Sequence, residues 1–245
     1  MVYTWKLQPG ADKAIKSAIS DICFSLRAED YLTLPKQTIV HHKIAMDTNV
    51  ASQYKQLKRD MVTQIGDIEI TAATAATLMG KLLQFTSGAL YDENKEWHEV
   101  HDAKLEFLES LLEEAAHPTL VFYHFKSSLE RLQARFPHAQ LLTDANIPLW
   151  QAGKIPLMLA QPMSGGIGLN LQCNEGDMAQ TVWYDLPWST ENYIQANARI
   201  YRQGQIKPVM LHHLVLAGTA DERVLEVIKG NVNTQDALLK ELKLE

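Results

Sequence analysis

Two arginines near the end of the chain have the type and spacing for phosphate chemistry. Arg199 and Arg202 lie in the segment QANARIYRQGQ, residues 195–205. Steps of three and four residues place Gln195, Arg199 and Arg202 near one face at the C-terminal end of a helix predicted over residues 191–203. Two guanidinium groups can reach the oxygens of one phosphate and stabilise charge that develops in phosphoryl transfer. An isolated pair of arginines would equally complement the helix dipole, so both interpretations stay open at this point.

A glycine-rich loop, MSGGIGLNL over residues 163–171, is the second candidate. Its glycines, Gly165, Gly166 and Gly168, expose backbone N–H groups and permit positive φ, which lets a chain approach a phosphate or a sugar-phosphate strand. The GGxG spacing differs from the GxGxxG of dinucleotide-binding folds. Taken alone, such a loop is more often a plain strand-to-helix turn.

Other chemical patterns are absent from the sequence or have a simpler explanation. No GxxxxGK[ST] loop occurs, so no lysine and hydroxyl are placed to hold nucleotide phosphates and Mg²⁺. Asp221 and Glu222 imitate an acidic DExx box but follow a predicted helix start, and we interpret them as first-turn acids favoured by the helix dipole. The histidines are scattered without ligand spacing, so no metal site is predicted. Six of the nine were considered as ligands: His41, His42, His101, His124, His212 and His213.

The elements that must position these residues change character near residue 101. From there, short apolar runs alternate with helical segments and lack strict polar alternation, which indicates strands buried on both faces. The runs are residues 119–123, 139–142, 156–160, 181–184 and 208–216. Residues 1–100 are predicted to be mainly helical. A helix is expected near 11–26, a second through 50–61 with Asp47 or Thr48 as its cap, and a third over 72–86 that ends near Gly88; residues 36–44 are expected to form a strand. The fold class is therefore α/β, a parallel sheet flanked by helices, whose ligands bind at the carboxyl ends of the strands.

Composition limits the partners. The chain of 245 residues carries a net charge of −6, which argues against a separate module that holds DNA by bulk electrostatics. No apolar run approaches the roughly 20 residues that span a bilayer, so no membrane partner is expected. The two cysteines, Cys23 and Cys173, suit buried thiols in a reducing cytoplasm.

Three segments together resemble a known family. MSGGIGLNL, VWYDLPWSTENYIQANARIYRQGQ and GTADERVLEVI look like motif V, motif VI and the following helix of the SWI/SNF-type ATPases, which are superfamily-two helicase-like motors. Residues 119–125 resemble motif IV, and the compact form is most similar to phage-encoded members. The resemblance implies a RecA-like three-layer lobe over residues 101–245. Residues 1–100 would then be the inter-lobe linker and a mainly helical attachment.

The resemblance also implies roles for individual residues. Arg199 and Arg202 would act on the γ-phosphate as arginine fingers, with Gln195 positioning them. Gly166, Gly168 and Gln203 would contact ATP. The DNA-side residues would be Ser164, Gly165, Asn170, Trp188 and His124.

These roles describe half of a motor. ATP and Mg²⁺ would be bound mainly by a first RecA-like lobe, in the same protein or a separate subunit, and the partner would be double-stranded DNA. The predicted function is the C-terminal lobe of an ATP-dependent DNA translocase or helicase, inactive by itself. A non-catalytic DNA- or protein-interaction module that retains the fold is the alternative, and a strand-separating helicase lobe is a closer one.

Overall fold

The computed structural model describes residue 8 and residues 10–19, 34–65, 67–72, 74–114, 117–162 and 169–230. Residues 1–34 and 35–245 form two separate units. In the first unit, helix α1 covers Ala11–Ile19, and the rest of the helix predicted up to residue 26 lies outside the described residues. All further elements belong to the second unit.

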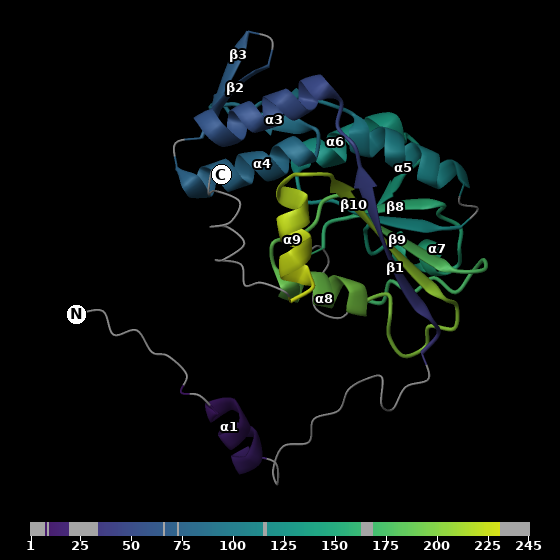
Figure 1. Cartoon of the computed structure of the whole chain (residues 1–245). Coiled ribbons are helices and arrows are strands. Elements are labelled where there is room, and N and C mark those ends of the chain that lie inside the picture. Colours follow the sequence, from purple (N-terminus) through teal and green to yellow (C-terminus); the bar gives the residue numbers. More distant parts are fainter. Residues whose placement is uncertain are drawn as a thin grey trace. The chain divides into compact units, whose positions relative to one another are not determined.

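A six-stranded sheet forms the centre of the second unit (Figure 1). The strand order is β1-β10-β9-β6-β8-β7, and every neighbouring pair is parallel. The strands are β1 Gln37–Ile44, β6 Thr119–Phe122, β7 Gln140–Leu141, β8 Leu157–Ala160, β9 Ala179–Trp183 and β10 Val209–Leu216. The predicted α/β class is confirmed, because the apolar runs that lack alternation are the strands with both faces covered.

Helices cover both faces of this sheet and make three layers. Alternate residues of β6 face opposite ways: Leu120 belongs to one apolar core and Val121 to the other. Helices α5 (Ala103–Glu114) and α6 (Lys126–Arg135) pack on the Val121 side. Helices α7 (Ile147–Gln151), α8 (Thr190–Ala198) and α9 (Ala220–Ile228) contribute to the Leu120 side.

The helical attachment has an apolar core of its own. Helices α3 (Thr48–Asp60) and α4 (Ala75–Thr86) bury Tyr54, Leu57 and Leu82 against each other. Asp47 caps α3 as predicted, with its Oδ1 accepting a 2.8 Å hydrogen bond from the Val50 N–H. Two hairpins, β2–β3 (Val62–Ile65, Ile68–Thr71) and β4–β5 (Ala89–Tyr91, Trp97–Glu99), were not foreseen in the sequence.

Strand β1 differs from its predicted place. Its residues were assigned to the attachment before residue 100, yet β1 is an edge strand of the central sheet and pairs with β10 along its whole length. The reason is non-local: the partner strand is β10, and a strand cannot show in its own sequence which distant segment supplies its hydrogen bonds.

A glycine fixes the end of α4. Gly88 has φ +93°, as predicted for the residue that follows a helix, and it is tightly packed. A Cβ atom there would lie 2.3 Å from both the Arg131 Nη1 and the His101 carbonyl oxygen, so only glycine fits. None of the helices in the described part of the chain is long and apolar enough to span a membrane.

Candidate functional site

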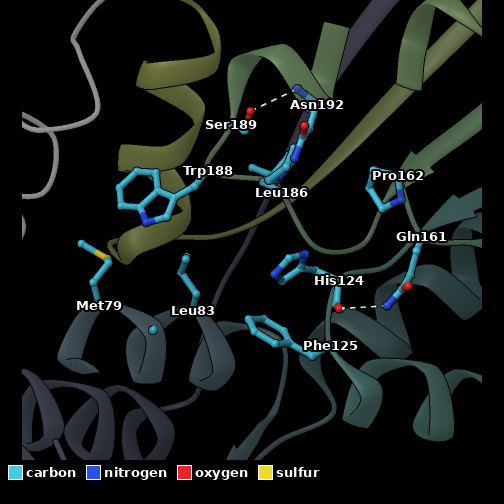
Figure 2. Close-up of a pocket in the computed structure, with 12 residues that line it drawn as sticks. Met79, Leu83, His124, Phe125, Gln161, Pro162, Leu186, Trp188, Ser189 and Asn192 are labelled. Atoms are coloured by element: carbon cyan, nitrogen blue, oxygen red, sulfur yellow. Dashed lines mark hydrogen bonds between the residues drawn. The ribbon is translucent and has the colours of Figure 1, made fainter. Parts of the chain in front are cut away.

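A pocket of about 520 Å³ lies at the carboxyl edge of the sheet, the edge at which ligands were expected (Figure 2). Its walls are the loops that follow β6, β8 and β9, together with α4. Two of the predicted DNA-side residues, His124 and Trp188, line it. The lining residues are otherwise mostly apolar, and none of those described carries a full charge. They are Met79, Gly80, Leu83, Phe125, Gln161, Pro162, Leu186, Pro187, Ser189 and Asn192.

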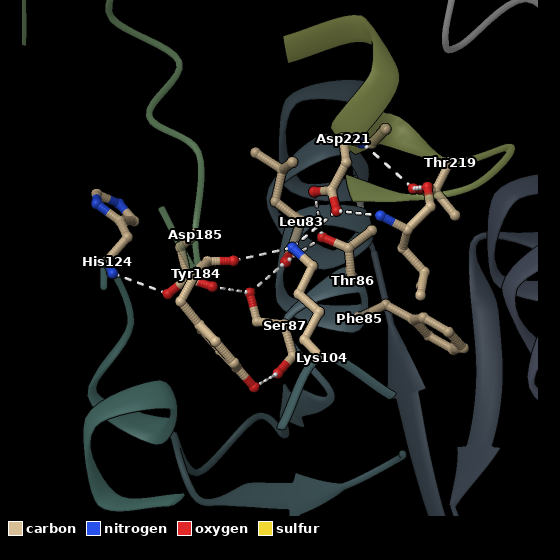
Figure 3. Close-up of polar contacts among 12 residues, drawn as sticks. Leu83, Phe85, Thr86, Ser87, Lys104, His124, Tyr184, Asp185, Thr219 and Asp221 are labelled. Atoms are coloured by element: carbon tan, nitrogen blue, oxygen red, sulfur yellow. Dashed lines mark hydrogen bonds and ion pairs between the residues drawn. The ribbon is translucent and has the colours of Figure 1, made fainter. Parts of the chain in front are cut away.

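Asp185, which closely follows β9, holds two of these loops together (Figure 3). Its carboxylate is buried and accepts hydrogen bonds from the His124 N–H at 2.8 Å and the Ser87 hydroxyl at 2.6 Å. Because Ser87 follows α4, one side chain links the loop after β6 to the helical attachment. Asp185 was not among the site residues predicted from the sequence. Its position just after a predicted strand was the only feature of the sequence that could have pointed to it.

A buried ion pair lies beside this link. The Lys104 ammonium donates to Asp221 Oδ2 at 2.7 Å and to the Tyr184 carbonyl at 3.0 Å (Figure 3). Asp221 also accepts from the Thr86 hydroxyl at 2.8 Å. Asp221 and Glu222 are first-turn acids of α9, as predicted, but Asp221 is also buried and joins α4, α5 and α9, which the sequence did not show. The sequence did not single out Lys104, because only the folded chain brings its ammonium to Asp221.

The two arginines do not share the helical face that was predicted. Helix α8 ends at Ala198, Arg199 is its C-cap and Arg202 lies in the following turn. The Arg199 carbonyl, which has no partner within the helix, accepts a hydrogen bond from the Leu171 N–H at 2.9 Å. Gly204, with φ +95°, then reverses the chain.

The turn that carries the arginines is clamped to the segment after the glycine-rich loop. Gln172 Nε2 donates to the Arg202 carbonyl at 2.9 Å and to the Gln203 carbonyl at 3.2 Å. Asn174 Nδ2 donates to the Gly204 carbonyl at 3.1 Å. These bonds go to backbone carbonyls, so they fix the backbone of the turn. They do not restrain the exposed side chains of Arg202 and Gln203.

The remaining predicted site residues have varied surroundings. Gln195 is exposed and donates to Glu191 Oε1 at 2.9 Å, while Asn170 Oδ1 accepts from the Gln172 N–H at 3.1 Å. Asn170, Arg199, Arg202 and Gln203 thus belong to one hydrogen-bonded region, whereas His124 and Trp188 meet in the pocket. Ser164, Gly165, Gly166 and Gly168 lie outside the described residues.

The histidines are not scattered as predicted. The parallel register of β1 and β10 sets His41 beside His213 and His42 beside His212, with nitrogen–nitrogen distances of 2.9 Å and 2.8 Å. Burial lowers the pKa of His212 to about 4, and that of His213 to about 3. In the part of the chain described, no three residues of the metal-binding types come together.

The fold and these loops define a class: a RecA-like α/β lobe whose ligand-facing residues gather at the carboxyl edge of a parallel sheet. No protein-family model matches the chain. It is 38% identical over 239 residues to "Putative protein p41" of Acyrthosiphon pisum secondary endosymbiont phage 1, which covers 94% of this chain and 51% of that protein. It is 28% identical over 156 residues to the chromatin-remodeling ATPase INO80 of Cryptococcus neoformans, covering 57% of this chain and 9% of INO80.

A solved structure agrees with the fold. The C-terminal part of the Fun30 ATPase domain superposes with a TM-score of 0.59 at 13% identity, covering 85% of this chain and 96% of that one. The sequence relatives, among them INO80 and a CHD3-type chromatin-remodeling factor of Arabidopsis thaliana, confirm the predicted resemblance to SWI/SNF-type ATPases, and the fold is that of the C-terminal part of the Fun30 ATPase domain. It spans about half of the length of the phage relative and a small fraction of INO80.

Proposed function

We propose that the chain is the second motor lobe of a SWI/SNF-type, ATP-dependent DNA translocase or helicase, and that Arg199 and Arg202 are its arginine fingers. The proposal rests mainly on the surroundings of Arg202. Its backbone is fixed by Gln172, its side chain is exposed, and no ion pair or hydrogen bond of its guanidinium occurs among the described residues. The backbone of Arg202 is thus positioned in advance, and the donors of its guanidinium stay available for the oxygens of a phosphate.

The competing explanation, a charge that complements the helix dipole, is weakened by the same geometry. The favourable effect of a cation falls off beyond the last turn, and Arg202 lies past the end of α8. Arg199, at the C-cap, remains compatible with both roles. The pair therefore supports phosphate chemistry mainly through the exposed Arg202.

The cofactor would be shared with another lobe. The guanidinium groups suit ATP phosphates, and Gln203, Gly166 and Gly168 are the further ATP contacts we propose. Mg²⁺ needs carboxylate or hydroxyl ligands that this chain does not gather among its described residues, so a Walker-containing first lobe would supply them. When bound, ATP supplies the γ-phosphoryl group that is transferred to water.

Double-stranded DNA is the proposed track. With −6 net charge, the chain offers few released counterions, so its contacts must come from placed groups: His124 and Trp188 at the pocket, Asn170, Ser164 and Gly165 near the glycine-rich loop. We place the working protein in the cytoplasm. A non-catalytic interaction module with the same fold is the rival, and such a module would have no need of the clamped arginine turn.

The deciding experiment measures steady-state ATP turnover, with saturating DNA, by a protein that joins this chain to its Walker-containing first lobe. Arg202→Ala and Arg199→Ala should each lower kcat, by about 10³–10⁵-fold where a finger is lost, with far less change in the KM for ATP. Arg202→Lys should restore little activity, because an ammonium lacks the planar fork.

The matched control is Arg59→Ala on α3. Arg59 is exposed and bonds only its neighbour Asp60 in the described structure, so its loss should leave turnover unchanged. Thermal melts of all variants separate a lost finger from a damaged fold. Normal turnover by both Arg199→Ala and Arg202→Ala would contradict the proposal and favour the interaction module.

A further inference from the structure

The pocket at the carboxyl edge combines aromatic rings with hydrogen-bonding edges. Trp188, Phe125 and His124 contribute three rings, and Figure 2 shows them around the space above α4. His124 and Phe125 meet edge to face, with ring centroids 5.0 Å apart. The side-chain amides of Gln161 and Asn192 complete the lining. Aromatic faces stack on any nucleobase, and amide or imidazole groups pair with its edges.

Gly80 keeps this space open at some cost to the helix. It lies in the middle of α4, where glycine is about 0.5–1 kcal/mol less favourable than alanine. Unlike Gly88, it has no positive φ, and a Cβ atom built there would meet nothing within 4 Å. The fold therefore has no steric need for glycine at this position. Its missing side chain instead lowers the helix surface, which allows close approach by the backbone of a ligand.

A basic groove begins on the other side of the same glycine. Gly80 lines both the pocket and a second hollow formed by α4 and the β4–β5 hairpin, in which Lys81 and Lys95 lie. Lys81 donates to the Tyr91 carbonyl, and burial lowers its pKa. The one carboxylate in this groove, Asp92, is engaged by His98 Nε2 at 3.0 Å and by the Glu96 N–H at 2.9 Å.

We propose that the pocket holds one unpaired base of the DNA, with its sugar crossing α4 at Gly80 and a flanking phosphate at Lys81 and Lys95. The uncharged, ring-lined pocket suits the base, and the lysines suit the phosphate. An apolar side chain of a protein would bury the side-chain amide of Asn192 without offering it a hydrogen bond, which is costly. The inference rests on the proposed function, because it names the form of DNA that this lobe contacts.

The test compares two duplexes of the same sequence, one fully paired and one with a single bulged 2-aminopurine. Titrated with the chain at low salt, the bulged duplex should bind about 5- to 100-fold more tightly, the range that base–aromatic stacking provides. Stacking on protein rings should also quench the 2-aminopurine emission. Equal affinity for both duplexes would overturn the inference.

Variants locate the effect. Gly80→Leu fills the pocket from a helical position with open space, so it should abolish the preference for the bulge while binding to the paired duplex persists. Gln56→Leu places the same side chain at an exposed site on α3 and should change nothing. Should Gly80→Leu not fold, Trp188→Leu removes a stacking ring and should give the same loss. A preference that survives in a folded pocket variant contradicts the inference.

Two competitors identify other occupants. If AMP displaces the bulged duplex at equal molar affinity, the pocket is a site for a free nucleotide and the inference is wrong. It is equally wrong if N-acetyl-tryptophanamide binds the pocket while the bulged duplex does not. The arginine experiment fails or succeeds separately, since the preference for a bulge needs no ATP turnover. A normal ATPase that lacks the preference refutes only this inference.

Discussion

At the scale of single residues, a buried ion pair links α5 to α9. The side chains of Lys104 and Asp221 are 1% and 3% exposed and lie 2.7 Å apart. Asp221 additionally receives the Thr86 hydroxyl and the Leu216 N–H. Removing one member of such a pair leaves the other charged and without its main partner in a low-dielectric region, which costs more than the intact pair contributes.

Lys104→Met and Asp221→Leu should therefore each lower the free energy of unfolding by about 3–5 kcal/mol. The double variant should lose much less than the sum, because neither charge is then left unpaired. Urea titrations of the unmodified protein, the two single variants and the double variant give a double-mutant cycle for the pair. Lys55→Met, on the exposed side of α3, is the control. Additive losses would show that the two groups act separately.

Two glycines should respond in opposite ways to the same substitution. Gly80→Ala should stabilise the protein by about 0.5–1 kcal/mol, since it improves a helix interior and meets nothing. Gly88→Ala should destabilise it by more than that, because φ is +93° and a backbone oxygen lies 2.3 Å from the new atom. Thermal melts decide the sign, and a loss of stability in Gly80→Ala would mean that the helix is packed more tightly there.

At the scale of elements, β1 depends on its histidines. One imidazole of each pair donates to the other, and Tyr193 OH lies 3.0 Å from the second ring nitrogen of His213. Burial lowers the pKa of all four histidines. For His41 and His213, the nearby Lys229 acts in the same direction. The folded state therefore favours the neutral rings, whereas the unfolded chain binds protons near the ordinary histidine pKa of about 6.5.

The free energy of unfolding should consequently be constant above about pH 7 and fall as the pH drops from about 6.5 toward 4. Stability falls with falling pH because the unfolded state binds more protons than the folded state between about pH 6.5 and pH 4. Replacing His213 with Gln should flatten the slope between pH 6.5 and 5, where few carboxylates titrate. The exposed His138 replaced with Gln should leave it unchanged. If the unmodified protein and both variants show the same slope, the His41–His213 pair does not cause the pH dependence.

At the scale of the whole molecule, the proposed function and the net negative charge predict a protein that depends on another lobe for ATP hydrolysis and for tight DNA binding. The sequence holds no Walker loop, and 29 acidic residues outnumber 23 basic ones. Two-lobe motors hydrolyse ATP only when nucleotide-binding groups and fingers face each other. In the proposed function, Arg199 and Arg202 would supply one side of that arrangement.

The chain alone should neither hydrolyse ATP nor bind paired DNA tightly. At physiological salt we expect affinities no better than the non-specific range of about 10⁻⁴–10⁻⁶ M, decreasing steeply as salt rises. Anisotropy with a labelled duplex and a phosphate-release assay measure both. Turnover that co-elutes with the pure chain on gel filtration, or nanomolar binding to paired DNA, would contradict this expectation.

Much of this protein is already determined by its sequence. The apolar runs without alternation predicted the parallel sheet, and the 3.6-residue periods predicted α3, α4 and the helices of the lobe, because both signals are local. The arginine segment and the resemblance were also visible. Asp47 and Gly88 marked a helix start and a helix end through their own chemistry, with no help from distant residues.

The tertiary structure decided what depends on distant partners. His41 and His213 are separated by 172 positions, and only the register of β1 on β10 makes them neighbours. Only the tertiary structure shows that α8 ends at Ala198 and that the carbonyl of its C-cap, Arg199, accepts from the Leu171 N–H. Lys104 and Asp221 form an ion pair only because folding buries their side chains next to each other. In each case the deciding hydrogen bond or desolvation joins segments that lie far apart in the chain, and local sequence patterns contain no information about that pairing.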